Sequence, residues 1–165
     1  MTGHWLMKTE PSTFSIDDLR RRGREPWDGV RNYQARNMIR DQMRVGDGVL
    51  IYHSNCDLPA VVGIARVASP AYPDPSALDP GSRYFDPAST PERPRWYAVD
   101  VAYEGHLPRP LPLAQLRTNP ELDGLILLKR GSRLSVMPVS QAHWTALLEL
   151  AGFRPPGCVT TDSAT

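Results

Sequence analysis

Short runs of apolar and β-branched residues alternate with turn-forming residues along the chain, which is typical of short β-strands. Only six residues separate the run at 49–53 from the run that begins at Ala60, so we expect these two to pair as antiparallel neighbours. Residues 27–30 form a turn or a short extended piece by the same criteria. The other predicted strands and extended pieces cover residues 4–8, 60–68, 95–104, 125–128 and 133–139.

Elsewhere the apolar residues recur three and four positions apart, and this spacing predicts helices. Ser15 is followed three positions later by Asp18, a pattern that resembles a capping box and marks the start of a helix. Serine or asparagine precedes two more helical segments, and glycine follows the first and the last. The predicted helices extend from Ser15 to Gly23, from Asn32 to Met43, from 113 to 117 and from Ser140 to Gly152.

Residues 69–94 carry a dense run of prolines, which predicts a segment without regular structure. Its aromatic residues, Tyr72, Tyr84 and Phe85, indicate a loop that packs on the surface. We expect residues 1–153 to form one domain and residues 154–165 to be a disordered polar tail. Five or six short strands with three or four short helices predict a small, barrel-like α+β domain.

Composition excludes several classes of protein. The 165 residues suffice for one domain with its own core, and 17 prolines argue against a helical bundle. The net charge of +1 excludes a protein that binds nucleic acid by bulk charge alone. We expect a cytoplasmic protein, because no apolar run reaches the roughly 20 residues of a membrane span. The N-terminus also lacks a signal-peptide pattern, and two cysteines make no disulfide framework.

Common catalytic and metal-binding motifs are absent from the sequence. It contains neither a glycine-rich phosphate loop nor the nucleophile elbow of α/β-hydrolases. The four histidines lie far apart, without the spacing of metal ligands. We therefore expect neither a metal ion nor a cofactor.

Residues 27–37 are unusually dense in hydrogen-bonding side chains. Aromatic rings stack on bases, Asp, Asn and Gln hydrogen-bond to base edges, and Arg binds phosphate, so this mixture suits recognition of an unpaired base. The alternative is an ordinary helix N-terminus, in which Asn32 is the cap and Trp27 and Tyr33 belong to the core. The pattern alone leaves both interpretations open.

Arginines are concentrated around the same segment. Residues 20–44 hold eight arginines against three acidic residues, which predicts a local positive region in a nearly neutral chain. Arg36, Arg40 and Arg44 share one face of the predicted helix. They either contact phosphates or form an ordinary solvated surface.

Two short polar segments lie at the ends of predicted strands. Lys8, Thr9 and Glu10 supply an amine, a hydroxyl and a carboxylate. In a strand Lys8 and Glu10 share a face while Thr9 points away, so we expect an ion pair there rather than a nucleophile beside its base. Residues 52–55 follow another strand, at a position where pockets often form.

These segments together resemble the EVE domain, a family of the PUA-like superfamily that also includes the YTH and ASCH domains. The eleven-residue segment 27–37 is the most specific match. The other matching segments are residues 5–14, 45–47, 52–55, 72–74, 94–96 and 133–136. They follow the order of the family and span residues 4–151, nearly the whole chain.

The resemblance implies a PUA-like five- or six-stranded β-barrel flanked by short helices. It also implies a non-catalytic reader that flips a modified base of DNA or RNA, a modified cytosine or methylated adenine, into a pocket. We expect a monomer or weak dimer. The pocket residues implied are Lys8, Thr9, Trp27, Asp28, Asn32, Tyr33, Tyr52, His53, Ser54 and Asn55, and the phosphate contacts are Arg31, Arg36, Arg95 and Arg133.

Two other functions stay open. Some ASCH relatives hydrolyse an acylated cytidine with Lys, Thr and Glu, so residues 8–10 would fit a hydrolase of a modified nucleoside. The pocket could also serve a small molecule or a protein and never contact nucleic acid. Salt separates these cases, because affinity that depends on phosphate contacts falls steeply with ionic strength.

Overall fold

The computed structural model describes residues 3–131 and 134–153. The expected disordered tail, 154–165, and the predicted phosphate contact Arg133 lie outside the described residues. None of the described helices has the length and apolar character that crossing a membrane requires.

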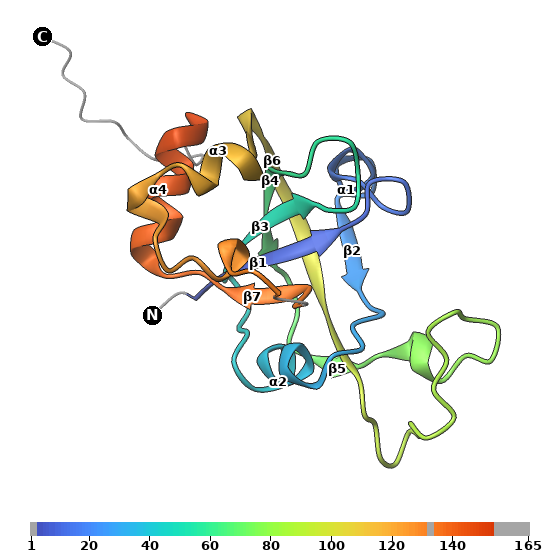
Figure 1. The fold of residues 1–165 in the computed structure, drawn as a ribbon. Coiled ribbons are helices and arrows are strands. Elements are labelled where there is room, and N and C mark those ends of the chain that lie inside the picture. The colour runs from blue at the N-terminus through green and yellow to red at the C-terminus, as the bar shows by residue number, and fades with distance from the viewer. Residues whose placement is uncertain (1–2, 132–133, 154–165) are drawn as a thin grey trace, which may run out of the picture.

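A single mixed sheet of seven strands organises the fold (Figure 1). The strand order is β2-β6-β4-β3-β1-β7, and the two-residue β5 pairs separately with β6. β1 and β3 are parallel, whereas the other pairs are antiparallel, including the predicted pair of β3 and β4. The strands are β1 (His4–Thr9), β2 (Arg24–Trp27), β3 (Gly48–His53), β4 (Ala60–Val67), β5 (Tyr72–Pro73), β6 (Tyr97–Pro112) and β7 (Val136–Pro138).

β6 is the longest strand and connects three parts of the sheet. It pairs with β5, β2 and β4 at successive positions, and register shifts accompany its pairing with β4. The sequence analysis ended this strand at residue 104, eight residues too early. It also missed β2, which contains Pro26 and lies at one end of the strand order, where proline is tolerated.

Helix capping follows the predicted local signals. Ser15 forms the complete capping box with Asp18, and Asn32 accepts a hydrogen bond from the Ala35 amide. The helices are α1 (Ile16–Arg22), α2 (Tyr33–Asp41), α3 (Leu113–Arg117) and α4 (Gln141–Ala151). Residues 125–128 were expected to be extended, but they include a 3₁₀ helix, η3 (Ile126–Leu128).

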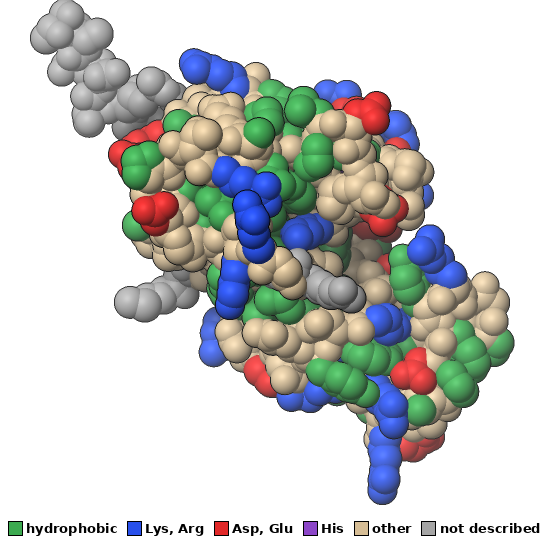
Figure 2. Space-filling model, viewed as in Figure 1, with side chains coloured by type: hydrophobic (Ala, Val, Ile, Leu, Met, Phe, Trp, Pro, Cys, Tyr) green, Lys and Arg blue, Asp and Glu red, His purple; other side chains and the backbone are tan. Residues whose placement is uncertain are grey.

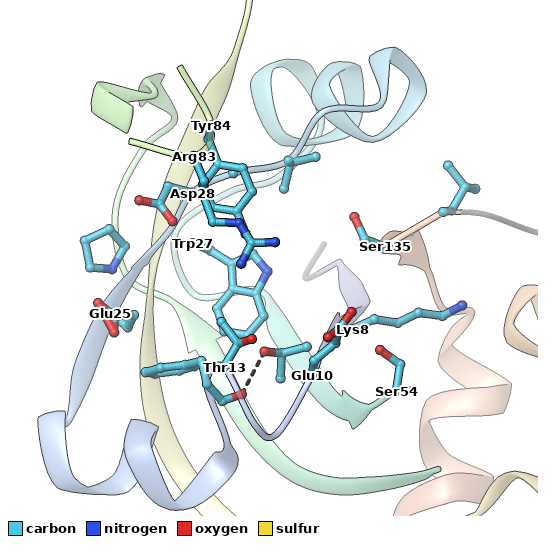
Figure 3. Close-up of a pocket in the computed structure, with 16 residues that line it drawn as sticks. Lys8, Glu10, Thr13, Glu25, Trp27, Asp28, Ser54, Arg83, Tyr84 and Ser135 are labelled. Atoms are coloured by element: carbon cyan, nitrogen blue, oxygen red, sulfur yellow. Dashed lines mark hydrogen bonds between the residues drawn. The ribbon is translucent and has the colours of Figure 1, made fainter. Parts of the chain in front are cut away.

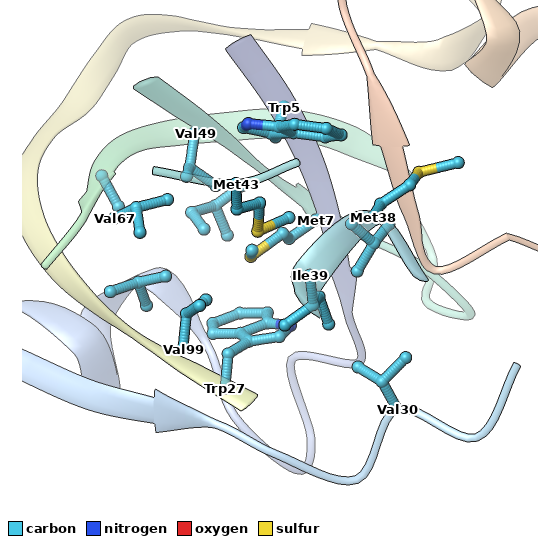
Figure 4. Packing of buried hydrophobic residues seen from close by; sticks show 14 of the residues in the cluster. Trp5, Met7, Trp27, Val30, Met38, Ile39, Met43, Val49, Val67 and Val99 are labelled. Atoms are coloured by element: carbon cyan, nitrogen blue, oxygen red, sulfur yellow. The ribbon is translucent and has the colours of Figure 1, made fainter. Parts of the chain in front are cut away.

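Apolar side chains form a core on each face of the curled sheet. In β1, Trp5 and Met7 face one core, while Leu6 between them faces the other. The first core includes Trp27 and the buried faces of α1 and α2 (Figure 4). The second packs against α3 and α4, which lie together on the other side of the sheet (Figure 1). Two pairs of helices thus cover the two faces of one sheet.

The proline-rich segment 69–94 is more ordered than its composition predicted. It contains β5 and a 3₁₀ helix, η1 (Pro75–Ala77), capped by the Asp74 side chain. The expectation of no regular structure was therefore wrong. Its packing as a surface loop is confirmed, because Asp74, Ala77 and Ser89 are buried.

Candidate functional site

A cavity of about 500 Å³ opens where the ends of β1 and β2 approach the proline-rich loop (Figure 3). Its volume lies within the range of small-molecule sites, about 300–1,000 Å³. Polar and aromatic side chains from five separate segments line it. The lining residues are Lys8, Thr9, Glu10, Thr13, Phe14, Glu25, Pro26, Trp27, Asp28, Gly29, Val30, Ser54, Arg83, Tyr84, Leu134 and Ser135.

Five of the ten pocket residues implied by the sequence line this cavity: Lys8, Thr9, Trp27, Asp28 and Ser54. The sheet brings them together, because β1 and β3 are parallel neighbours and the Ser54 amide donates to the Thr9 carbonyl at 2.9 Å. Trp27 and Asp28 approach from the end of β2. In Figure 3, Lys8 and Ser54 lie on one side of the Trp27 indole and Asp28 lies on the other.

Trp27 belongs both to the cavity wall and to the core. Its residue surface is only 8% exposed, and it packs in the first core among Val30, Ile39 and Val99 (Figure 4). Phe14, another lining residue, meets the indole edge-on, with the ring centroids 6.0 Å apart. Trp27 is therefore a core residue that also forms part of the cavity wall, and its role in recognising a base stays a prediction.

Asn32 and Tyr33 lie outside the cavity lining. Asn32 uses its side-chain oxygen to cap α2, at 3.0 Å from the Ala35 amide nitrogen. Tyr33 is 51% exposed and stacks on Trp96, with the centroids 4.8 Å apart. The Asn32 side chain is therefore used to cap α2, and Tyr33 belongs to neither the cavity nor the core.

Tyr52, His53 and Asn55 do not line the cavity either. Tyr52 points to the opposite face of β3 and is buried in the second core. The His53 Nε2 accepts a hydrogen bond from the Ile16 amide at 3.1 Å, so this ring anchors the start of α1. Asn55 adopts a left-handed conformation, with φ of 51°, in the turn after β3. Of this segment, only Ser54 contributes to the lining.

Arg31 is fully occupied inside the protein. Its Nε and Nη2 donate to the Tyr84 carbonyl at 3.2 and 2.6 Å, and Nη1 donates to the Val30 carbonyl. The remaining two donors bond the buried Asp74 carboxylate at 2.9 Å and the Ser76 hydroxyl. A guanidinium has five N–H donors, and all five have acceptors here. The expected phosphate contact of Arg31 is therefore incompatible with this arrangement.

Arg36 and Arg95 remain at the surface, near one another. Arg36 Nη1 donates to the Arg95 carbonyl at 2.8 Å, and its guanidinium lies 4.9 Å from the Tyr33 ring centroid. The Arg95 side chain is exposed. Neither arginine lines the cavity, and a phosphate contact of either stays a prediction.

The local positive region expected at residues 20–44 is largely neutralised. Six of its eight arginines form ion pairs with described residues, the two exceptions being Arg36 and Arg44. Figure 2 shows Asp and Glu side chains among the Lys and Arg side chains on the face viewed there. The five exposed pairs contribute little stability, unlike the buried Arg31–Asp74 pair, but together the six remove most of the net field expected from the sequence.

Burial shapes the chemistry of residues 8–10. The half-buried position of Lys8 lowers the pKa of its ammonium group. Among the described residues no ion pair joins Lys8 to Glu10, so that expectation was wrong. Thr9 lines the cavity beside them, yet its hydroxyl donates to the Phe14 carbonyl at 2.7 Å. The three residues share a cavity without forming a hydrogen-bonded catalytic set.

Two carboxyl groups give the β2 side of the cavity acidic character. Burial raises the pKa of Asp28, and the neighbouring Asp74 charge raises it further. Burial also raises the pKa of Glu25, although its ion pair with Arg22 opposes the shift. These groups offer acceptors to a ligand, whereas Lys8 on the other side offers donors.

The sequence analysis missed Arg83 and Tyr84 as lining residues. Both belong to the proline-rich loop. The sequence contained one signal for this loop, its aromatic residues, and that signal indicated only that the loop packs on the protein surface. Ser135, which precedes β7, was also missed. Its carbonyl accepts a hydrogen bond from the Lys8 amide at 2.8 Å, so Ser135 lies directly beside β1. Within the described residues no group of His, Cys, Asp and Glu side chains is arranged to hold a metal ion.

Comparison with known proteins identifies relatives over most of the chain. A model of the EVE domain matches residues 3–150. Thymocyte nuclear protein 1 of Homo sapiens is 36% identical over 174 residues, covering 94% of this chain and 76% of that protein. A crystal structure from Pseudomonas putida superposes with a TM-score of 0.87 at 50% identity, over 90% of this chain and 99% of that one.

Two further structures were solved with nucleic acid. The human THYN1 protein in complex with 5-methylcytosine containing DNA has a TM-score of 0.86 at 36% identity, covering 93% of this chain and all of that one. The YTH domain of Zygosaccharomyces rouxii MRB1, solved with N6-methyladenosine RNA, has a TM-score of 0.50 at 14% identity, over 92% and 88% of the chains. The second likeness concerns the fold alone. Together they confirm the PUA-like α+β fold, here as a curled sheet.

Proposed function

This chain belongs to the EVE domain family, and we propose that it is a non-catalytic reader of a modified base in DNA or RNA. The flipped base would enter the cavity beside Trp27, between the acceptors of Asp28 and the donors of Lys8. The observation that carries the proposal is an aromatic ring in the wall of an open cavity of about 500 Å³ with polar groups on both sides of it.

The energetics of a flipped base suit such a cavity. Removing a base from its stack costs a few kcal/mol, and stacking on an aromatic ring recovers about 1–3 kcal/mol. Burying one additional methyl group adds about 1 kcal/mol. A methyl group alone therefore discriminates only modestly, and hydrogen bonds to the base edge must supply the rest. Asp28, Ser54 and Lys8 provide such groups.

The human relative indicates which base to test first. That protein was solved in complex with DNA containing 5-methylcytosine, and it shares 36% identity with this chain over nearly its full length. We extend this binding to the present chain as a proposal, with 5-methylcytosine as the first candidate. Phosphates beside the base would contact Arg36 and Arg95. The Arg95 side chain is exposed, and Arg36 has donors that no described residue accepts.

Hydrolysis of an acylated nucleoside is the weaker alternative. Lys8, Thr9 and Glu10 line the cavity, which is the observation in its favour. However, a hydroxyl nucleophile needs a base within hydrogen-bond reach, and the Thr9 proton is directed to the Phe14 carbonyl. Turnover of acylated cytidine by the purified protein, lost in Lys8→Ala, would establish the alternative.

The test is a titration against matched oligonucleotides. Single- and double-stranded DNA and RNA would carry one central cytosine, 5-methylcytosine, adenine or N6-methyladenine. We expect tighter binding to one modified base than to its unmodified counterpart, and affinity that falls steeply with salt. Equal affinity for every modified and unmodified oligonucleotide, or no binding at all, would contradict the proposal.

A tryptophan pair supplies the matched control. Trp27→Leu removes the aromatic wall, so we expect about tenfold weaker binding to the preferred oligonucleotide. Trp144→Leu makes the same change on α4, where the ring packs in a tilted arrangement against His4, outside the cavity lining. It should leave affinity unchanged once both variants are shown to be folded by thermal melting.

Two expectations from the sequence remain predictions. We expect the chain to be a monomer or weak dimer, which sedimentation would measure. We also keep the expectation of a cytoplasmic location, although the human relative is by its name a nuclear protein. Localisation of a tagged full-length chain would decide this point.

A further inference from the structure

The loop side of the cavity contains an aromatic ring and a cation that none of the preceding roles uses. Arg83 and Tyr84 belong to the proline-rich loop between β5 and β6, yet both line the cavity with Trp27. In Figure 3 they lie on the same side of the cavity as Asp28, away from Ser54 and Ser135. A ligand beside Trp27 would therefore meet residues far from β2 in the sequence.

Arg31 fixes the backbone at this point of the loop. Two of its donors converge on the Tyr84 carbonyl, and its Nη1 bonds the Asp74 carboxylate, whose side chain is fully buried. The same Asp74 carboxylate accepts the Gly29 amide at 2.9 Å. The segment after β2 and the loop that carries Tyr84 are thus held to one another by the buried Arg31–Asp74 ion pair and the hydrogen bonds around it.

Close packing also fixes the Tyr84 ring. Gly29 has φ of 77°, and a Cβ atom placed on it would lie only 2.7 Å from two carbons of the Tyr84 ring. Glycine therefore allows the ring to pack directly against the backbone of residue 29. A ring held in this way loses little conformational entropy when a planar ligand stacks on it.

Arg83 differs from Arg31 in having its guanidinium available. The residue is exposed, and its guanidinium lies 5.1 Å from the Tyr84 ring centroid. Within the described part of the chain, no hydrogen bond or ion pair engages it. Its five donors are therefore available at the cavity to a nucleotide phosphate, and the guanidinium lies next to an aromatic ring.

We propose that Tyr84 and Arg83 are the ligand contacts on the loop side of the cavity. Tyr84 stacks on the flipped base as a second aromatic contact beside Trp27, and Arg83 binds the phosphate of the same or the adjoining nucleotide. Arg31 and Asp74 position both residues. This inference rests on the proposed reader function and assigns to Arg83 the phosphate contact that the sequence assigned to Arg31.

The test compares variants of Tyr84 and Arg83 with matched controls. The probe is the oligonucleotide with one central 5-methylcytosine, measured beside its unmodified counterpart at several salt concentrations. Tyr84→Ala should weaken binding about tenfold or more, whereas Tyr84→Phe keeps the ring and should stay within about threefold of wild type. Tyr103→Ala removes a partly buried aromatic residue of β6 outside the cavity lining and should have no such effect.

Arg83→Ala has a different expected signature. It should lower the slope of log affinity against log salt by about one, with the preference for the modified base unchanged. Arg117→Ala, at the end of α3, is the matched control and should keep the wild-type slope. Melting temperatures of all variants would identify any that are unfolded, and Tyr84→Phe and Arg83→Ala remain informative if Tyr84→Ala fails to fold.

The outcomes separate this inference from the reader function. If wild type prefers the modified oligonucleotide but Tyr84→Ala and Arg83→Ala match their controls, the inference is wrong and the reader function stands. If wild type binds none of the oligonucleotides, both are wrong. Equal losses in Tyr84→Ala and Tyr84→Phe would show that the hydroxyl, and not stacking of the ring, carries the contact, which also overturns the inference as stated.

Discussion

Asp74→Ala should destabilise the protein more than its place in a surface loop would suggest. The carboxylate is fully buried and accepts four hydrogen bonds, from the Gly29 amide, from Arg31 and from the amide and hydroxyl of Ser76. Alanine would leave these donors without their acceptor and would remove one partner of a buried ion pair.

The expected loss is about 3 kcal/mol of unfolding free energy. Removing one member of a buried pair costs about 3–5 kcal/mol. The Arg31 side chain is 23% exposed, so water can solvate part of it in the variant, and the lower end of that range applies. A loss of this size is a large share of the 5–15 kcal/mol that stabilises a typical domain.

The loss should also depend on pH. Burial alone would raise the pKa of Asp74, but hydrogen bonds from Ser76, Arg31 and Gly29 outweigh it and hold the pKa below its ordinary value. A lowered pKa in the folded state contributes stability above the unfolded pKa of about 4, which is lost as pH falls through the folded value. The difference between wild type and Asp74→Ala should therefore shrink in acid.

Urea unfolding followed by tryptophan fluorescence measures both effects. Asp79→Ala is the matched control, because Asp79 is an exposed loop residue whose carboxylate accepts a hydrogen bond from the Gly81 amide and from no other described residue. It should change the unfolding free energy by no more than about 0.5 kcal/mol. If Asp74→Ala loses less than about 1 kcal/mol at neutral pH, the loop is not held by this ion pair and the argument fails.

Three further substitutions test other parts of the structure. Trp27→Ala should lose about 3–5 kcal/mol of stability by urea unfolding, because the ring is core as well as wall, and a near-neutral result would contradict its burial. Asn32→Ala should lose about 1 kcal/mol by removing the cap of α2, whereas Asn32→Ser should retain most of it. The raised pKa of Asp28 means that wild-type stability falls as pH rises through it, so Asp28→Asn should melt higher than wild type at pH 7 and equally at about pH 3. A gain that persists in acid would show a cause other than charge burial.

Local signals accounted for the parts of the fold that sequence could predict. Ser15 with Asp18, Asn32, and the final glycine of α4 act within one helical turn, so their residue types suffice to place helix ends. The pairing of β3 and β4 was also predictable, because only a short loop separates them. In each case the interacting groups are near neighbours in the chain.

Long-range pairing produced the errors in strand prediction. Residues 105–112 include glycine and prolines, which weaken any local strand pattern, and they are extended because β4 provides partners for them. Pro26 likewise obscured β2, which among the described strands pairs only with β6, more than 70 residues away. Such strands depend on a partner that a local window of sequence does not contain.

The site shows the same contrast: residue types could be read from the sequence, but the partners of each side chain could not. Composition identified segment 27–37 as rich in groups that bind nucleic acid, and Trp27 and Asp28 do line the cavity. It could not show that the loop carrying Tyr84 satisfies four of the five Arg31 donors and the Val30 carbonyl satisfies the fifth. A side chain's charge follows from its type, but its availability follows from what the fold places around it. For this reason the arginine whose donors remain available to a ligand in the cavity is Arg83, which lies in a segment with little local sequence pattern.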